Sequence, residues 1–253
     1  MGVYVNEEML NDIGKSIIGG VKMNWLLILV IVVLAFYSLN GRRRGLIKTV
    51  FIMFSTIISL VVTGWIAPVV SKEVQKNDRI ISSVSDKVGK VLDFSGVGTK
   101  ISDEVNFIDK LSIPSAMKNA LLENNTKDIY VAMAVDNFKE YVCNYLTRTI
   151  INAAVFLIIF IIVRIALIVI SQTLDLISKL PVLNGLNKTA GLLAGFFHGI
   201  IIIWVGCLII TVLGSTPAGQ YFFAQISNST VLSTIYNNNL LLRVITNIGE
   251  SLF

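Results

Sequence analysis

The chain has 253 residues, of which 54% are hydrophobic and only 15% are charged. Soluble domains carry about 25% charged residues, so this balance excludes an ordinary soluble protein. The formal net charge is +5, but eleven of the 21 Lys and Arg lie between residues 72 and 148, where eleven Asp and Glu balance them. The positive surplus therefore comes mainly from short basic loops, a pattern of membrane topology that argues against nucleic-acid binding.

The first two apolar runs predict two membrane-spanning helices joined by a short turn. The first lies between Asn24 and Asn40, and the second covers about residues 49–70 and ends at Ala67-Pro68. Each reaches the length needed to cross a hydrocarbon layer of about 30 Å. Because the intervening turn at residues 41–45 begins and ends with glycine, we expect a tight hairpin.

The long polar segment that follows is predicted to form a small helical cap. Apolar residues recur at helical spacing over 80–92, which indicates an amphipathic helix. A second, short helix is predicted to open at Ser112–Ser115 and to close at Asn124-Asn125. From Thr126 the apolar pattern runs into the third span, so we expect that helix to project beyond the bilayer. A cap that covers the bundle or lies in the interface is favoured over a partner-binding surface.

Two further spans and an interfacial tail complete the predicted fold, an all-α bundle of four transmembrane helices with an extracytoplasmic helical insertion between helices 2 and 3. The third span covers about 149–170 and the fourth about 190–213. The later groups Tyr221–Phe223 and Leu240–Leu242 are too short to cross a membrane and suit interfacial helices. The predicted organisation is an N-terminal tail (1–23), a transmembrane hairpin (24–70), an extracytoplasmic helical segment (71–148), transmembrane helices 3 and 4 (149–213) and an interfacial C-terminal segment (214–253).

Basic residues in the short loops predict the orientation. Arg42, Arg43, Arg44 and Lys48 lie in the first loop, and Lys179 and Lys188 lie in the loop between the last two spans. Such loops are usually cytoplasmic, so both termini and residues 71–148 are predicted to be extracytoplasmic. The N-terminal tail lacks the basic start of a signal peptide and is expected to be retained.

Two stripes of small residues predict close helix packing. Gly191, Gly195 and Gly199 recur every four residues in the fourth span, and Ser55, Ser59 and Thr63 do so in the second. Small residues at this spacing let helix backbones approach closely in lipid. Lining of a polar path is the less favoured alternative for the hydroxyl stripe.

Two ionisable residues lie inside predicted spans. Arg164 has apolar sequence on both sides, and a charge at such a place indicates function by default. It also lies about two turns from the cytoplasmic end, where its side chain could snorkel to the headgroups, and the two interpretations carry equal weight. His198 lies at a comparable depth, so a polar contact between the two helices is conceivable; for a lone His a structural role is favoured over a proton relay.

The sequence contains no motif of catalysis, and we predict no catalytic, cofactor or metal site. It has a single His, no Gly-rich phosphate loop and no pair of intramembrane Asp residues. Cys143 and Cys207 are expected at different depths, so we predict no disulfide between them.

Several segments, taken in order, resemble the bacterial colicin V production protein family. They are Asn24-Trp25-Leu26, Gly41–Ile47, Leu180–Lys188, Gly191–Gly195, Ile113-Pro114, Ser229–Leu232 and Ile235–Asn238. The resemblance covers nearly everything after residue 23. The chain departs from it at Leu27, where the family often has an acidic residue, and at His198, where a basic residue is common.

This resemblance implies a multi-pass protein of the bacterial cytoplasmic membrane, linked to the production or export of a peptide toxin and to envelope homeostasis. It implies no defined reaction or cofactor. The expected partners are the lipid bilayer, other copies of the chain or other membrane proteins, and not nucleic acid. A small ion or solute channel or transporter is the alternative function, suggested by Arg164, His198 and the hydroxyl stripe.

Overall fold

The computed structural model describes residues 24–95, 97–98, 100–173 and 185–251, and within these ranges all regular structure is helical. Four of the helices are long and apolar enough to cross a membrane, which confirms the prediction of an all-α chain with four such helices. The predicted tail 1–23 and Lys179 lie outside the described residues. The helices are α2 (Trp25–Arg44), α3 (Leu46–Val74), α4 (Asp78–Val91), α5 (Ile101–Lys110), α6 (Ser115–Glu123), α7 (Lys127–Met133), α8 (Phe138–Thr173), α9 (Gly185–Val212), α10 (Pro217–Ser227), α11 (Thr230–Asn237) and α12 (Leu240–Ser251), with a short 3-10 turn at Leu213–Ser215.

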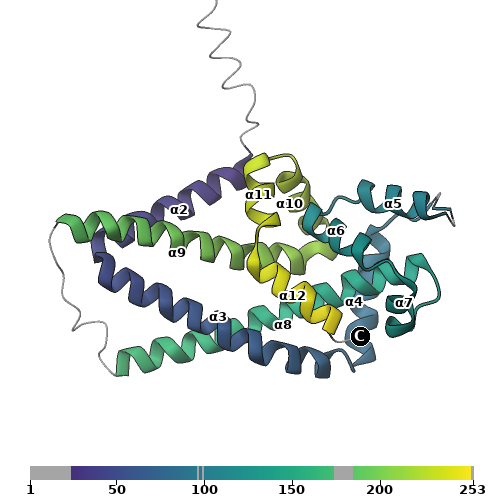
Figure 1. The fold of residues 1–253 in the computed structure, drawn as a ribbon, viewed down its shortest axis with the longest axis horizontal. Helices are drawn as coiled ribbons and strands as arrows, with labels where there is room; N and C mark the ends of the chain where they lie inside the picture. The colour runs from purple at the N-terminus through teal and green to yellow at the C-terminus, as the bar shows by residue number, and fades with distance from the viewer. Residues whose placement is uncertain (1–23, 96, 99, 174–184, 252–253) are drawn as a thin grey trace, which may run out of the picture.

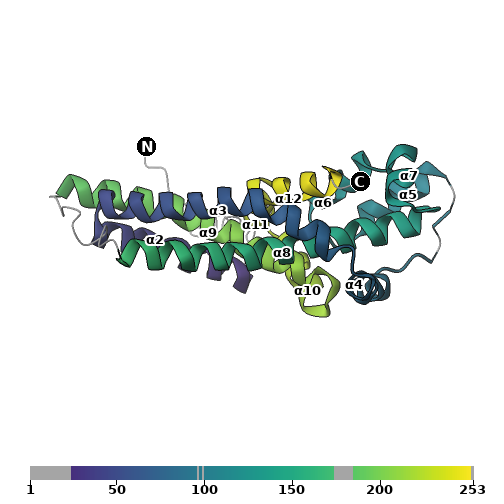
Figure 2. The same cartoon turned by 90° about the horizontal axis from the view of Figure 1, so that it is seen from below.

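The molecule is elongated, and its two ends differ in character. Helices α2, α3, α8 and α9 run along the long axis, and the turn between α2 and α3 lies at one end (Figure 1). The helices α4 to α7 of the insertion gather at the other end, around the start of α8 (Figures 1 and 2).

Helix α2 packs chiefly against α9 and less extensively against α3, its neighbour in the predicted hairpin. Only Gly45, with a φ of 79°, separates α2 from α3. A positive φ at this place favours glycine, because a Cβ would strain the turn. The tight turn of the predicted hairpin is therefore present, but α2 packs more extensively against α9, whose glycines allow a closer approach than the side chains of α3.

Helix α3 continues through Pro68 and ends at Val74, so the predicted end at Ala67-Pro68 was wrong. Proline removes one backbone donor and its ring crowds the carbonyl four residues earlier, which here belongs to Gly64. Within a membrane bundle, neighbouring helices and side chains make such a proline tolerable. The extension carries the buried Ser71 towards α8.

The helix that contains the third span begins at Phe138, before the predicted span at 149 but after the start of the apolar pattern at Thr126. Helix α7 ends at Met133, because Ala134 adopts a left-handed conformation with a φ of 51°, which does not continue a right-handed helix. Asn137 then accepts a hydrogen bond from the backbone N–H of Glu140 and starts α8. At 1.5 Å per residue the 36 residues of α8 extend for about 54 Å, well beyond a 30 Å hydrocarbon layer.

The three C-terminal helices cover the bundle. Phe223, Tyr236 and Ile245 of α10, α11 and α12 are at most 1% exposed, because they pack against α8, α9 and the insertion. Asn239 accepts from the backbone N–H of Leu241 and donates to the Trp204 carbonyl of α9 at 3.0 Å. These helices therefore form part of the protein core, and an interfacial position for them stays a prediction.

Candidate functional site

The polar stripe of α3 lies inside the bundle. Thr56, Ser59 and Thr63 are fully buried. Each hydroxyl donates to the carbonyl oxygen four residues earlier on its own helix, at 3.0, 2.8 and 2.7 Å respectively. These donors are satisfied locally, so the stripe needs neither water nor ligand, and its small side chains let neighbouring helices come close.

Thr56 links α3 to α9 through His198, which is 6% exposed. The Thr56 Oγ1 and His198 Nε2 atoms are 3.0 Å apart. Because the Thr56 hydroxyl donates to the Ile52 carbonyl, we assign the histidine hydrogen to Nε2, which then donates to Thr56 Oγ1. The Tyr37 ring of α2 meets the imidazole edge to face at a centroid distance of 5.0 Å. His198 is thus a contact point of three helices.

Arg164 links α8 to the same place on α3. Its Nη1 donates to Ser55 Oγ at 2.6 Å, and the side chain is half-buried. At 1.5 Å per residue, Arg164 lies about 14 Å along α8 from its last residue, and His198 lies about 20 Å along α9 from its first. The predicted polar contact between the helices is therefore indirect, since adjacent residues of α3 hold Arg164 and His198 separately.

The glycine stripe of α9 faces α2. A Cβ built on Gly191 would lie 2.4 Å from the Gly41 carbonyl oxygen, and one on Gly195 would lie 2.3 Å from the Tyr37 carbonyl oxygen. At Gly199 the nearest atom is 3.2 Å away, on the Tyr37 side chain. Gly41, which the sequence presented only as a turn residue, is the matching small residue on α2.

The basic residues of the first loop lie at the end of the bundle. Arg42, Arg43 and Arg44 form the exposed last turn of α2, and Lys48 lies half-buried at the start of α3. Asn187 of α9 closes this end, because its Oδ1 accepts from the Leu46 backbone N–H at 2.8 Å.

A second polar cluster, which the sequence did not suggest, joins α3 to α8 near the opposite end. The buried Asn152 Oδ1 accepts hydrogen bonds from Ser71 Oγ and from Gln75 Nε2. Arg148 Nη1 donates to Gln75 Oε1 at 2.8 Å. The sequence did contain a signal for this cluster: Ser71 and Gln75 are four residues apart after the second predicted span, and Arg148 and Asn152 are four residues apart at the start of the third.

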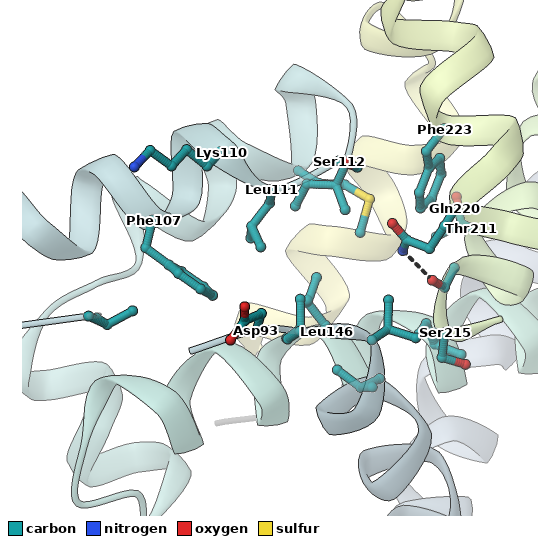
Figure 3. Close-up of a pocket in the computed structure, with 18 of the residues that line it drawn as sticks. Asp93, Phe107, Lys110, Leu111, Ser112, Leu146, Thr211, Ser215, Gln220 and Phe223 are labelled. Atoms are coloured by element: carbon teal, nitrogen blue, oxygen red, sulfur yellow. Dashed lines mark hydrogen bonds between the residues drawn. The ribbon is translucent and has the colours of Figure 1, made fainter. Parts of the chain in front are cut away.

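A cavity of about 500 Å³ lies between the insertion and the ends of α8, α9 and α10 (Figure 3). Its apolar wall includes Leu111, Met117, Leu146 and Phe223. It brings together residues from α4 to α6, the loops between them, α8, α9 and α10. No periodic pattern in the sequence links these segments, which is why the cavity was not predicted.

The described part of the chain has no grouping of three or more His, Cys, Asp or Glu side chains arranged to hold a metal. Cys143 is half-buried, Cys207 is buried, and both are free thiols.

A family model with the description "Colicin V production protein" matches residues 129–239. This segment takes in most of α7 and all of α8 to α11, and the match confirms the family resemblance over that part of the chain. No curated protein and no solved structure matches the chain.

Proposed function

We propose that this chain, whose residues 129–239 match the model of the colicin V production protein family, belongs to that family and supports the production or export of a peptide toxin and envelope homeostasis. The match is the observation that carries the proposal. It falls on α8 and α9, the helices that bring Arg164 and His198 to α3. We place the protein in the bacterial cytoplasmic membrane.

The proposed activity is non-enzymatic and depends on the bundle itself. The polar side chains within the spans bond to their own helices or to one another, as expected of groups that hold helices together. The second half of α8 exposes Ile161, Ile162 and Ile165, each more than half accessible. Such a surface suits contact with lipid, with a second copy of the chain or with another membrane protein.

Deletion of the gene tests this proposal. We expect the deletion strain to release less peptide toxin into the medium and to tolerate detergent or osmotic stress less well than the parent, and a plasmid copy should restore both. Normal release together with normal stress tolerance would contradict the proposed function.

The proposed orientation places both termini and the insertion outside, with the Arg42–Arg44 turn in the cytoplasm. In a chain that carries Cys143→Ser and Cys207→Ala, we expect a cysteine introduced at the exposed Lys87 of α4 to react with an impermeant maleimide in intact cells. A cysteine at the exposed Arg43 should react only after the cells are permeabilised. The reverse order of labelling would show that the topology is inverted.

A small channel or transporter is the second candidate, because Arg164 is a half-buried charge within an apolar helix and has a polar partner on a neighbouring helix. If the bundle conducts, purified protein in liposomes should pass ions or small solutes, and Arg164→Leu should abolish the flux while Arg164→Lys retains part of it. Liposomes as tight as protein-free ones would eliminate this candidate.

A further inference from the structure

The cavity between the insertion and the bundle lies at the level where the apolar helices end. Ile150 and Thr211, near the ends of the apolar parts of α8 and α9, are among its lining residues. The neighbouring α10 places Tyr221 in a stacked contact with Trp25 at the start of α2, with ring centroids 6.5 Å apart. Exposed Trp and Tyr side chains at span ends are typical of the membrane surface. A membrane surface at these aromatic side chains would bring the cavity within reach of molecules dissolved in one leaflet.

The wall of the cavity suits an apolar body. Met117, Leu146 and Phe223 are at most 5% exposed and form its buried side, and Phe107 and Leu111 extend over its open side (Figure 3). A volume of about 500 Å³ falls within the range of about 300–1,000 Å³ that is usual for small-molecule sites. Burying an alkyl chain here gains about 0.8 kcal/mol for each methylene removed from water.

Gln220 offers a hydrogen-bond acceptor to an occupant of the cavity. Gln220 Nε2 is committed to the Gly214 carbonyl at 2.6 Å, which leaves the Gln220 Oε1 atom as an acceptor on the cavity side (Figure 3). The Thr211 hydroxyl is engaged by the Cys207 carbonyl and by Tyr236.

The lining holds two carboxylates, the exposed Asp93 and the half-buried Asp103, and one ammonium group, that of Lys110, so its net charge is negative. Asp93 lies between Phe107 and Leu146, whereas the ammonium group of Lys110 points away (Figure 3). The hydroxyl and then the backbone N–H of Ser95 hold the pKa of Asp93 below its ordinary value, so this carboxylate stays ionised. A positively charged donor is the complementary group.

We propose that this cavity binds an amphiphile with an alkyl body and a primary ammonium head, the alkyl chain against Leu111, Leu146 and Phe223 and the ammonium at Asp93. Both a membrane lipid with an amine headgroup and a free alkylamine have this chemistry. The proposal goes beyond the function proposed above, because binding can be measured on the purified protein whether or not the chain supports toxin export.

The test uses the full chain in phosphatidylcholine nanodiscs, which contain no primary amine, and a dodecylamine probe with a photoreactive diazirine in its chain. We expect the probe to label cavity residues. Asp93→Asn, which keeps the acceptor for Ser95, should lower the labelling roughly three- to fivefold, the effect of a solvent-exposed charge pair. Leu111→Trp should fill the cavity and abolish the labelling, and Lys110→Gln is the matched control that should leave it unchanged.

Equal labelling by a matched probe with a sulfate head, or full labelling of Asp93→Asn, would overturn the proposal. If Leu111→Trp does not fold, the comparison of Asp93→Asn with Lys110→Gln decides alone. Nanodiscs doped with phosphatidylethanolamine identify the source: reduced labelling indicates a lipid, and unchanged labelling with competition by free dodecylamine indicates a soluble amine.

Discussion

Replacing Gly195 with alanine is expected to lower the free energy of unfolding by about 1–3 kcal/mol, the usual effect of overpacking a close contact. The added Cβ would lie 2.3 Å from the Tyr37 carbonyl oxygen and 3.0 Å from Ser38 Cα. Both atoms belong to the backbone of α2, which cannot yield as a flexible side chain can. The helices α2 and α9 must therefore separate. Unfolding by SDS in mixed micelles gives the free energy.

Gly206 provides the matched control on the same helix. A Cβ at Gly206 meets no atom within 4 Å. Gly206→Ala should therefore stabilise α9 slightly, by up to about 1 kcal/mol, because alanine loses less backbone freedom on folding. The two substitutions are identical in chemistry and should have opposite signs. Equal effects would show that the glycine stripe does not set the distance between α2 and α9.

The second large effect is expected at the contact between α3 and α9. Thr56→Val keeps the shape of the side chain but leaves the hydrogen on His198 Nε2 without its acceptor, 3.0 Å away in the wild type. An unsatisfied buried donor costs about 1–3 kcal/mol, although hydrogen bonds between membrane helices average less. We expect a loss of stability at the lower end of this range in the same SDS titration.

A double-mutant cycle separates this contact from packing. In His198→Leu the Thr56 hydroxyl still donates to the Ile52 carbonyl, so no donor is orphaned. Adding Thr56→Val to His198→Leu should then cost much less than adding it to the wild type, because the histidine that it would leave unsatisfied is absent. Additive effects would show that the 3.0 Å contact contributes nothing to stability.

The number of helices of membrane-spanning length was predictable because each depends on a continuous apolar run, a local property of the sequence. The turn at Gly45 was also predictable, because this glycine follows three arginines between two apolar runs. The packing partner of α2 could not be predicted, because the hydrophobic pattern shows which residues avoid water but not which helices pack together in lipid. The matching of Gly41 with Gly191 became apparent only from the distance between the two backbones.

The ends of helices were harder to predict, because tertiary contacts can override the local effect of a residue such as proline. Pro68 would end a helix in water, yet α3 continues to Val74 and brings Ser71 and Gln75 to Asn152. The apolar pattern that runs through Ala134 hid a left-handed residue that only the backbone reveals. Neither feature leaves a periodic signal in the sequence.

The sequence identified the residues of the candidate site, but it did not show which of them form hydrogen bonds with one another. Arg164 and His198 are recognisable in sequence as ionisable residues within apolar runs, and their comparable depth left a polar contact between their helices open. The structure joins them through Ser55 and Thr56, consecutive residues whose side chains contact different helices. The cavity near Asp93 was not predicted, since it gathers residues from many segments.

The most direct test of the central claim, that an intact helical bundle supports toxin export, is the amount of peptide toxin released per cell by a complemented deletion strain. Wild type and Gly206→Ala should restore release. Gly195→Leu, whose side chain must displace α2, should leave release near the level of the deletion although the chain is still made. Release from the uncomplemented deletion strain equal to that of the parent would contradict the account.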